Sequence, residues 1–280
     1  MGFSVVNNVS AITAQRSLGQ NEMMMNRTLN RLSTGLRINR AADDAAGLAI
    51  SSGLRSDIRA MRQGIRNAND GVSFVQVTEG ALEEINSILT RMKELAEQGA
   101  SDTTGVDDGS EKEALQAEVA ELIEEIDRIN AVTSYNGRSV LQDVSLDVQV
   151  GITDGTESRI TIDTGGPTNL DVTATNLGVG AVDVSNKTGA QSALGLIDTA
   201  IDRVSALRGD LGATQSRLDT AARNQGLVVE EMVAAESRIR DADIAAEVVA
   251  LTKTQILSQT GMSALAQANQ QSQSVLTLLG

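Results

Sequence analysis

The chain has 280 residues, with 23 Lys and Arg against 37 Asp and Glu, and it contains neither His nor Cys. Without imidazole or thiol groups, Ser-His-Asp and Cys-His catalytic sites are excluded, as are the usual zinc sites. The net charge of −14 argues against general binding to nucleic acid or anionic membranes. Three aromatic residues against a 41% hydrophobic content indicate an aliphatic core of the kind found in helix–helix seams.

Both ends of the chain lack charged side chains: none occurs in residues 1–15 or in residues 254–280. A solvated helix normally carries charges on its outer face. Glutamines interrupt the C-terminal apolar run, which argues against a membrane span, and the N-terminal run has no basic region of a signal peptide. We therefore expect protein to cover both ends, namely each other and further copies of the chain.

Apolar residues at helical spacing begin near the N-terminus and predict a helix there. A first series comprises Val5, Val9 and Ile12. A second series, displaced from the first by one position, comprises Leu18, Met25, Leu29, Leu32 and Leu36. The segment that follows holds Arg40 close to Asp43 and Asp44, which are candidates for charge-assisted pairs.

Three further series with steps of three and four residues predict two long helices, at about 72–98 and 190–238, and a short one at 115–129. Their apolar positions are Val75, Leu82, Ile85, Leu89, Met92 and Ala96, then Leu115, Val119, Leu122, Ile126 and Ile129, then Leu194, Ile197, Ile201, Val204, Leu211, Leu218, Val229, Met232 and Ile239. A last seam comprises Val248, Leu251, Met262 and Leu265. Such seams each need a partner helix, so the fold class is mainly α: a long, coiled-coil-like helical rod.

The pattern changes between residues 138 and 190. Leu146, Val148, Val150 and Ile152 alternate with polar residues, and Ile160 and Ile162 alternate again after a turn at Asp154-Gly155. This alternation predicts a small β-hairpin inserted into the helical fold.

Several adjacent carboxylate pairs are the only features that suggest catalysis. Neighbouring positions of a helix point about 100° apart, so a pair such as Glu124 and Glu125 does not make a site by itself. We expect no enzyme activity, no cofactor and no metal site.

Two segments carry a family resemblance. RLSTGLRINRAADDAAGLAIS, which begins at Arg31, resembles the N-terminal signature of bacterial flagellins, and residues 234–280 are similar to the C-terminal signature. LTRMKELAEQGA at 89–100 and LQAEVAELIEEIDRINAVTSYNGRSVL at 115–141 also resemble the helical part of that family. The resemblance covers about residues 1–145 and 190–280.

The resemblance implies a subunit that polymerises into the filament of the bacterial flagellum. It implies N- and C-terminal inner-tube helices at 1–42 and 241–280, rod helices at 43–137 and 191–240, and a variable insert at 138–190. The subunit-packing residues expected from this organisation are Val5, Val9, Ile12, Arg31, Arg40, Asp43, Asp44, Val248, Leu251, Met262, Leu265, Leu276 and Leu279.

The resemblance also implies partners and a location. They are other flagellin copies, an export chaperone, and cap and junction proteins, with export by the flagellar type III route to the extracellular filament. An animal Toll-like receptor reads an Arg, a Leu and a Glu that fall at Arg91, Leu95 and Glu118 of this sequence. Two alternatives remain open: a hook–filament junction protein, and a signalling helical hairpin that would keep charged faces to its ends.

Overall fold

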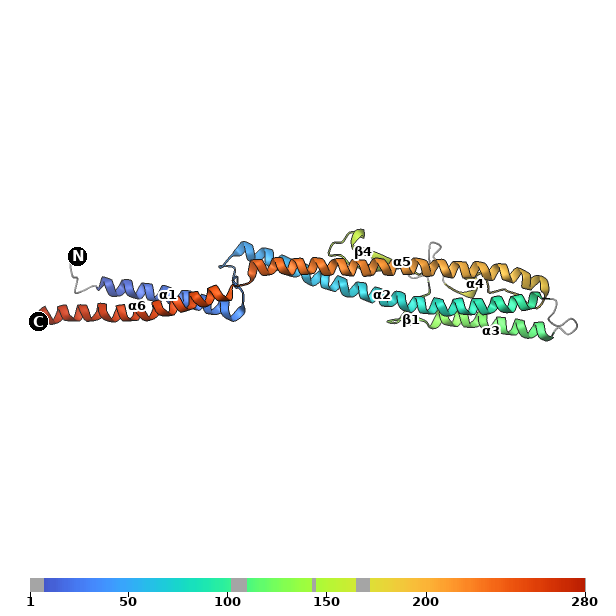
Figure 1. The fold of residues 1–280 in the computed structure, drawn as a ribbon, viewed down its shortest axis with the longest axis horizontal. Helices are drawn as coiled ribbons and strands as arrows, with labels where there is room; N and C mark the ends of the chain where they lie inside the picture. The colour runs from blue at the N-terminus through green and yellow to red at the C-terminus, as the bar shows by residue number, and fades with distance from the viewer. Residues whose placement is uncertain (1–7, 102–109, 143–144, 165–171, 280) are drawn as a thin grey trace. The chain divides into compact units, whose positions relative to one another are not determined.

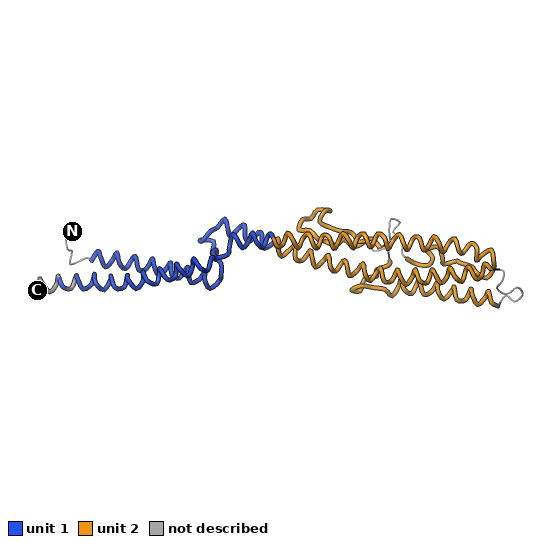
Figure 2. The backbone as a smooth tube through the Cα atoms, viewed as in Figure 1, with its two compact units in different colours: residues 1–56, 231–280 blue, residues 57–230 orange. Residues whose placement is uncertain are grey.

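The computed structural model describes residues 8–101, 110–142, 145–164 and 172–279, and most of them are helical (Figure 1). The chain divides into two compact units: unit 1, residues 1–56 and 231–280, and unit 2, residues 57–230 (Figure 2). The predicted mainly α fold with paired terminal helices and a small β-hairpin is confirmed.

Unit 1 is built on an antiparallel pair of helices, α1 (Val9–Thr34) and α6 (Ile244–Leu279) (Figure 1). Asn8 caps α1 by accepting a hydrogen bond from the backbone N–H of Ala11, and its amide donates to the carbonyl of Ala268 at 3.0 Å. At the other end, α1 stops at Gly35, whose φ of 71° is the left-handed conformation that a glycine adopts without strain.

Two very long helices contribute residues to both units: α2 (Ala45–Ala100) and α5 (Lys187–Arg240). The observed α5 extends only a few residues beyond the predicted limits of 190 and 238. The predicted start of the second helix, near residue 72, is wrong, because α2 begins at Ala45. The side chain of Asp44 accepts a hydrogen bond from the N–H of Gly47 at 2.8 Å and so caps the helix there.

The core of unit 2 lies among α2, α3 (Ser110–Val132) and α5. The seam positions predicted from periodicity are its centre, since Val75, Leu82, Ile85 and Leu89 are all fully buried. The core continues onto α3 and α5, where Val119, Ile126, Ile197, Val204, Leu211 and Leu218 are buried. Ion pairs across the helix surfaces, Arg208–Glu83 and Lys93–Asp198, also join α5 to α2.

The predicted hairpin forms from β3 (Ser145–Gln149) and β4 (Arg159–Asp163), which pair antiparallel with Val148 opposite Ile160. Its β3 strand ends earlier than predicted, because Val150 and Ile152 belong to the connection. That connection includes the short 3₁₀ helix η1 (Thr156–Ser158) rather than a two-residue turn.

A second, smaller hairpin was not predicted. It consists of β1 (Ser134–Tyr135) and β2 (Arg138–Ser139), joined by Asn136 and Gly137 with φ values of 52° and 76°. Positive φ at both central residues is the requirement of a type I′ turn, and Asn-Gly is its preferred sequence. The dipeptide was the available signal. A four-residue helix, α4 (Ala174–Leu177), completes unit 2 and packs near α3.

Candidate assembly surface

Unit 1 leaves exposed many apolar side chains of the kinds that unit 2 buries in its own core. In the described part of the chain, thirteen of the eighteen exposed large hydrophobic side chains belong to unit 1, although unit 1 is the smaller unit. Conversely, Ile38 is the one buried hydrophobic residue in the described part of unit 1. A concentration of exposed apolar side chains is typical of an interaction surface.

The exposure is strongest on α6. A shallow groove there is lined by Val248, Val249, Thr252, Lys253, Ile256 and Leu257. Val249 is 69% exposed and Ile256 is 61% exposed. The face of α6 that carries these residues thus meets no neighbour within the described part of unit 1.

The seam between α1 and α6 is narrow. Its fully covered side chains are small and polar: Thr28 on α1 and Thr254 on α6, the latter donating its hydroxyl hydrogen to helix carbonyls. Gly261 of α6 lies next to α1, since a Cβ added there would be in ordinary contact, at 3.4 Å, with the Leu18 side chain. The seam between the two helices thus leaves many of their large apolar side chains exposed.

The predicted packing residues divide along this seam. Val9, Ile12, Val248 and Met262 are exposed, while Leu251 and Leu265 are half-buried. Val5 and the side chains of Leu276 and Leu279 lie outside the described residues. The exposed members are not covered within the described part of unit 1, and the half-buried members are partly covered there.

Polar contacts fix the turn that follows α1. The backbone N–H of Arg37 donates to the carbonyl of Arg240 at 2.7 Å, and that of Ala242 donates to the carbonyl of Gly35 at 2.9 Å. Ile38, which belongs to this turn, is 1% exposed. The segment that follows α1 and the segment that precedes α6 are thus held together by backbone hydrogen bonds.

Two ion pairs join segments far apart in the sequence within unit 1. Arg31 pairs with Glu247 at 3.0 Å, linking α1 to the first turn of α6. Arg55 donates through two nitrogens to one oxygen of Glu236, at 2.6 and 3.1 Å, linking α2 to α5. The carboxylates of both pairs are largely covered, which reduces screening by solvent.

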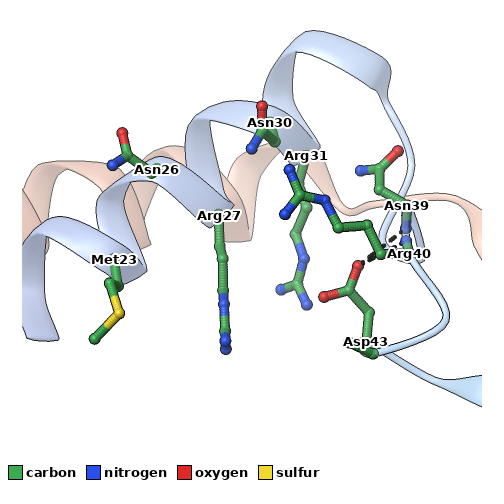
Figure 3. Close-up of a pocket in the computed structure, with 9 residues that line it drawn as sticks. Met23, Asn26, Arg27, Asn30, Arg31, Asn39, Arg40 and Asp43 are labelled. Carbon is green, nitrogen blue, oxygen red and sulfur yellow. Dashed lines mark hydrogen bonds between the residues drawn. The ribbon is translucent and has the colours of Figure 1, made fainter.

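Asp43 does not form the predicted charge-assisted pair with the Arg40 guanidinium. Its carboxylate instead accepts hydrogen bonds from the backbone N–H groups of Arg40 and Asn39, at 3.0 and 3.2 Å (Figure 3). These hydrogen bonds lower the pKa of the Asp43 carboxyl, and nearby arginines add to the effect. The two predicted carboxylates are therefore backbone caps: Asp43 stabilises the turn, and Asp44 begins α2.

The three receptor-contact candidates lie together in unit 2. Arg91 on α2 pairs with Glu118 on α3 at 2.8 Å and with Glu94 at 3.0 Å, and both sides of these pairs are exposed. Hydrogen bonds from the guanidinium to Glu118 and then Glu94 raise the pKa of Arg91. Leu95 is 1% exposed and packs in the core. Of the three candidates, Arg91 and Glu118 are therefore exposed, and Leu95 is buried in the core of unit 2.

The described residues contain no group of three or more Asp or Glu side chains arranged to hold a metal ion. None of the described helices is long and apolar enough to cross a membrane. The surface that distinguishes this molecule is the apolar one of unit 1.

Comparisons with known proteins identify the family to which the chain belongs. The model of the bacterial flagellin N-terminal helical region matches residues 5–145, and that of the C-terminal helical region matches residues 194–279. The chain belongs to the bacterial flagellin family. The predicted resemblance is thus confirmed over the same two segments, with the β-hairpin β3–β4 largely between them.

Three curated relatives are similar over almost their whole length. The flagellin of Halalkalibacterium halodurans is 43% identical over 97% of this chain and 98% of the relative. The flagellar filament 33 kDa core protein of Treponema phagedenis is 39% identical, and flagellin FlaB2 of Treponema pallidum is 38% identical, with the same coverage.

Proposed function

We propose that this chain is the structural subunit of a bacterial flagellar filament and that it polymerises through its terminal helices. The observation that carries the proposal is the uncovered apolar surface of α1 and α6 in a member of the flagellin family. Each residue of this surface that a neighbouring subunit covers contributes to association through the hydrophobic effect. Family and relatives both support a structural role, not a catalytic one.

In this proposal the terminal helices, residues 1–42 and 241–280, form the inner part of the filament. The segments at 43–137 and 191–240 form the layer around it, and residues 138–190 are the variable insert. The charge-free end of α6 supports the inner position, because a helix without charged side chains avoids solvent on all sides only when other chains surround it.

The experiment is seeded elongation of purified monomer, measured by light scattering and electron microscopy. A chain with Val249→Asp and Ile256→Asp places two charges on the exposed face of α6 and should fail to elongate seeds. Deletion of residues 254–280 should have the same effect while the helical circular dichroism of the remaining chain persists. Elongation of either variant at the unmodified rate would overturn the proposal.

A matched control separates loss of apolar contact from damage to the helix. Val249→Leu with Ile256→Leu changes the same two positions but keeps them apolar, and neither side chain is enclosed in the monomer. This control should elongate seeds at close to the unmodified rate. Its failure would show that the aspartate result reports helix disruption rather than a lost interface.

The remaining partners are proposed from the likeness to the flagellin family. We expect delivery to the extracellular filament by the flagellar type III route, with an export chaperone, a filament cap and junction proteins as transient partners. Deletion of the flagellar export apparatus in the producing cell should retain the chain inside; secretion that persists would contradict the route.

Recognition by a host Toll-like receptor is a separate proposal and rests on Arg91, Leu95 and Glu118. Because Arg91 and Glu118 pair with each other on the exposed surface, a receptor would meet them as one polar feature. Arg91→Ala and Glu118→Ala should each weaken signalling in a reporter cell. Arg128→Ala, which removes an exposed arginine ion-paired on α3, is the control and should leave potency unchanged.

A further inference from the structure

We propose that a basic cleft on unit 1 binds the acidic outer face of α3 in a second copy of the chain. The inference rests on the proposed polymerisation and specifies one of its contacts. The apolar surface of α6 does not specify which surface of the next subunit it meets. The proposed polar contact specifies that partner surface and a direction of assembly.

The cleft lies where α1 meets the turn that follows it, and it measures about 330 Å³ (Figure 3). Its lining is polar at almost every position, and comprises Met23, Asn26, Arg27, Asn30, Arg31, Asn39, Arg40, Ala42 and Asp43. All of these residues belong to unit 1, so the cleft is complete within that unit.

Positive charge predominates in this cleft. Three of its lining residues are arginines and one is an aspartate. Arg31 is neutralised by Glu247, and Asp43 offsets a second arginine, so one net positive charge remains. Asp43 competes weakly for the guanidinium groups, because the backbone N–H groups of Asn39 and Arg40 occupy its Oδ2 atom.

Two of the guanidinium groups have N–H donors that no described residue of the chain accepts from. Among the described residues, neither Arg27 nor Arg40 forms an ion pair or a side-chain hydrogen bond. Each presents up to five N–H donors in a planar arrangement that matches a carboxylate. The amides of Asn26 and Asn30 add neutral donors on the same wall. This set of donors suits carboxylate groups that arrive from outside the unit.

The outer face of α3 offers such carboxylates. Glu113, Glu121 and Glu124 lie eight and three residues apart, which places them on one face of the helix. The buried positions of α3, among them Val119 and Ile126, lie on the opposite face. The three glutamates are exposed and form no ion pair within the described part of the chain.

The distribution of charge along the chain agrees with a contact between a basic and an acidic segment. Residues 1–70 carry nine basic and five acidic side chains, whereas residues 71–130 carry four basic and fifteen acidic ones. A contact between two different surfaces of identical subunits is heterologous and generates an open helical polymer when the rotation does not close. Pairing the basic cleft with α3 therefore favours a head-to-tail filament over a symmetric dimer.

Charge reversal tests the pairing. Arg27→Glu with Arg40→Glu should slow seeded elongation at low salt at least about tenfold, because like charges then face each other. Glu121→Arg with Glu124→Arg should slow it similarly, and the two altered chains mixed together should recover. The control is Arg59→Glu with Arg62→Glu, which makes the same change of charge at exposed positions of α2 outside the cleft.

The controls separate this inference from the proposed function. If the unmodified chain fails to elongate seeds, the filament proposal fails. If it elongates and the cleft variant elongates equally well, only the cleft inference fails. Loss of elongation in the cleft variant without recovery on mixing would also overturn it, because a merely damaged fold gives that result.

Crosslinking tests the contact in chains with every cleft arginine intact. The chain has no Cys, so Asn26→Cys in one preparation and Glu121→Cys in another give one reactive thiol each. Filaments grown from the mixture and treated with a short bis-maleimide should yield a product of two chains. Replacing Asn26→Cys by Arg59→Cys should reduce that product to background. Equal yields from the two pairs would contradict the assignment.

Discussion

Unit 2 and unit 1 are built from the same kinds of residue and differ in what covers them. In unit 2 the apolar face of each long helix meets at least one other helix, and Leu82, Ile85 and Leu89 are fully buried. In unit 1 the apolar faces of α1 and α6 share one narrow seam, and Val9, Val249 and Ile256 are exposed. Unit 2 therefore has its own hydrophobic core, whereas the apolar faces of unit 1 are covered on one side only.

Polar contacts join distant segments in both units, and in unit 1 they supplement a narrow apolar seam. Within unit 1, ion pairs and backbone hydrogen bonds join segments about 200 residues apart, as in Arg31–Glu247 and Arg37–Arg240. Such contacts are directional, so they set the register of the segments even where little apolar area is buried. Unit 1 is thus held in a defined conformation while its apolar surface remains available to other subunits.

The largest effect that separates the two units should come from removing one apolar side chain from each. Leu82→Ala in unit 2 should lower the free energy of unfolding by about 3 kcal/mol, because it leaves a cavity in a filled core. Ile256→Ala in unit 1 should change that free energy by less than about 0.5 kcal/mol. Chemical denaturation of the monomer, followed by circular dichroism, measures both.

Seeded elongation should rank the same variants in the opposite order. Ile256→Ala should slow elongation more than Leu82→Ala does at a temperature where both monomers remain folded. If Ile256→Ala instead destabilises the monomer as much as Leu82→Ala, unit 1 has a core of its own and the comparison is wrong.

Periodicity predicted the core of unit 2 closely. The positions Val75, Leu82, Ile85, Leu89 and Met92 were selected by spacing alone, and all are fully buried. The pairing of β3 with β4 was likewise predictable from alternation. Both succeed because a helix or strand with one apolar face buries that face wherever the remaining chain supplies a partner.

The same spacing could not show which predicted positions remain exposed. Leu29 and Met262 follow the spacing as well as Leu82 does, yet both are exposed, because a sequence pattern identifies an apolar face and not what covers it. Nor could spacing assign Asp43, whose partners are set by the backbone turn after α1. The Arg55–Glu236 pair, 181 residues apart, has no local signal at all.

A smaller effect should come from the ion pairs of unit 1. Arg55→Ala should lower the free energy of unfolding by about 1 kcal/mol, since the pair is partly solvated. A double-mutant cycle with Glu236→Ala isolates the interaction. The exposed pair Arg128–Glu125 of unit 2 is the comparison and should show less coupling. Equal coupling energies would mean that the covered Glu236 gives the unit 1 pair no advantage.

The smallest effects should appear in the titration of two carboxyl groups. The pKa of Asp43 in unit 1 is lowered chiefly by backbone N–H groups, and that of Glu125 in unit 2 chiefly by its hydrogen bond to Arg128. A lowered native pKa stabilises the fold above the pKa of the unfolded chain, and this contribution is lost as pH falls through the native value. Both contributions should therefore begin to fall below about pH 4 and disappear once the pH lies below the lowered native pKa of each group.

Salt should separate the two groups. An exposed ion pair is screened by salt, whereas hydrogen bonds from a fixed backbone turn persist. In carbon-13 NMR titrations of the monomer, raising the salt concentration should move the pKa of Glu125 toward its ordinary value more than that of Asp43. Arg128→Ala should remove the shift of Glu125 and leave Asp43 unchanged. If the pKa of Asp43 proves as salt-sensitive as that of Glu125, its shift comes from the neighbouring arginines. Asp43 would then compete for the guanidinium groups of the cleft, and they would not be free to bind another chain.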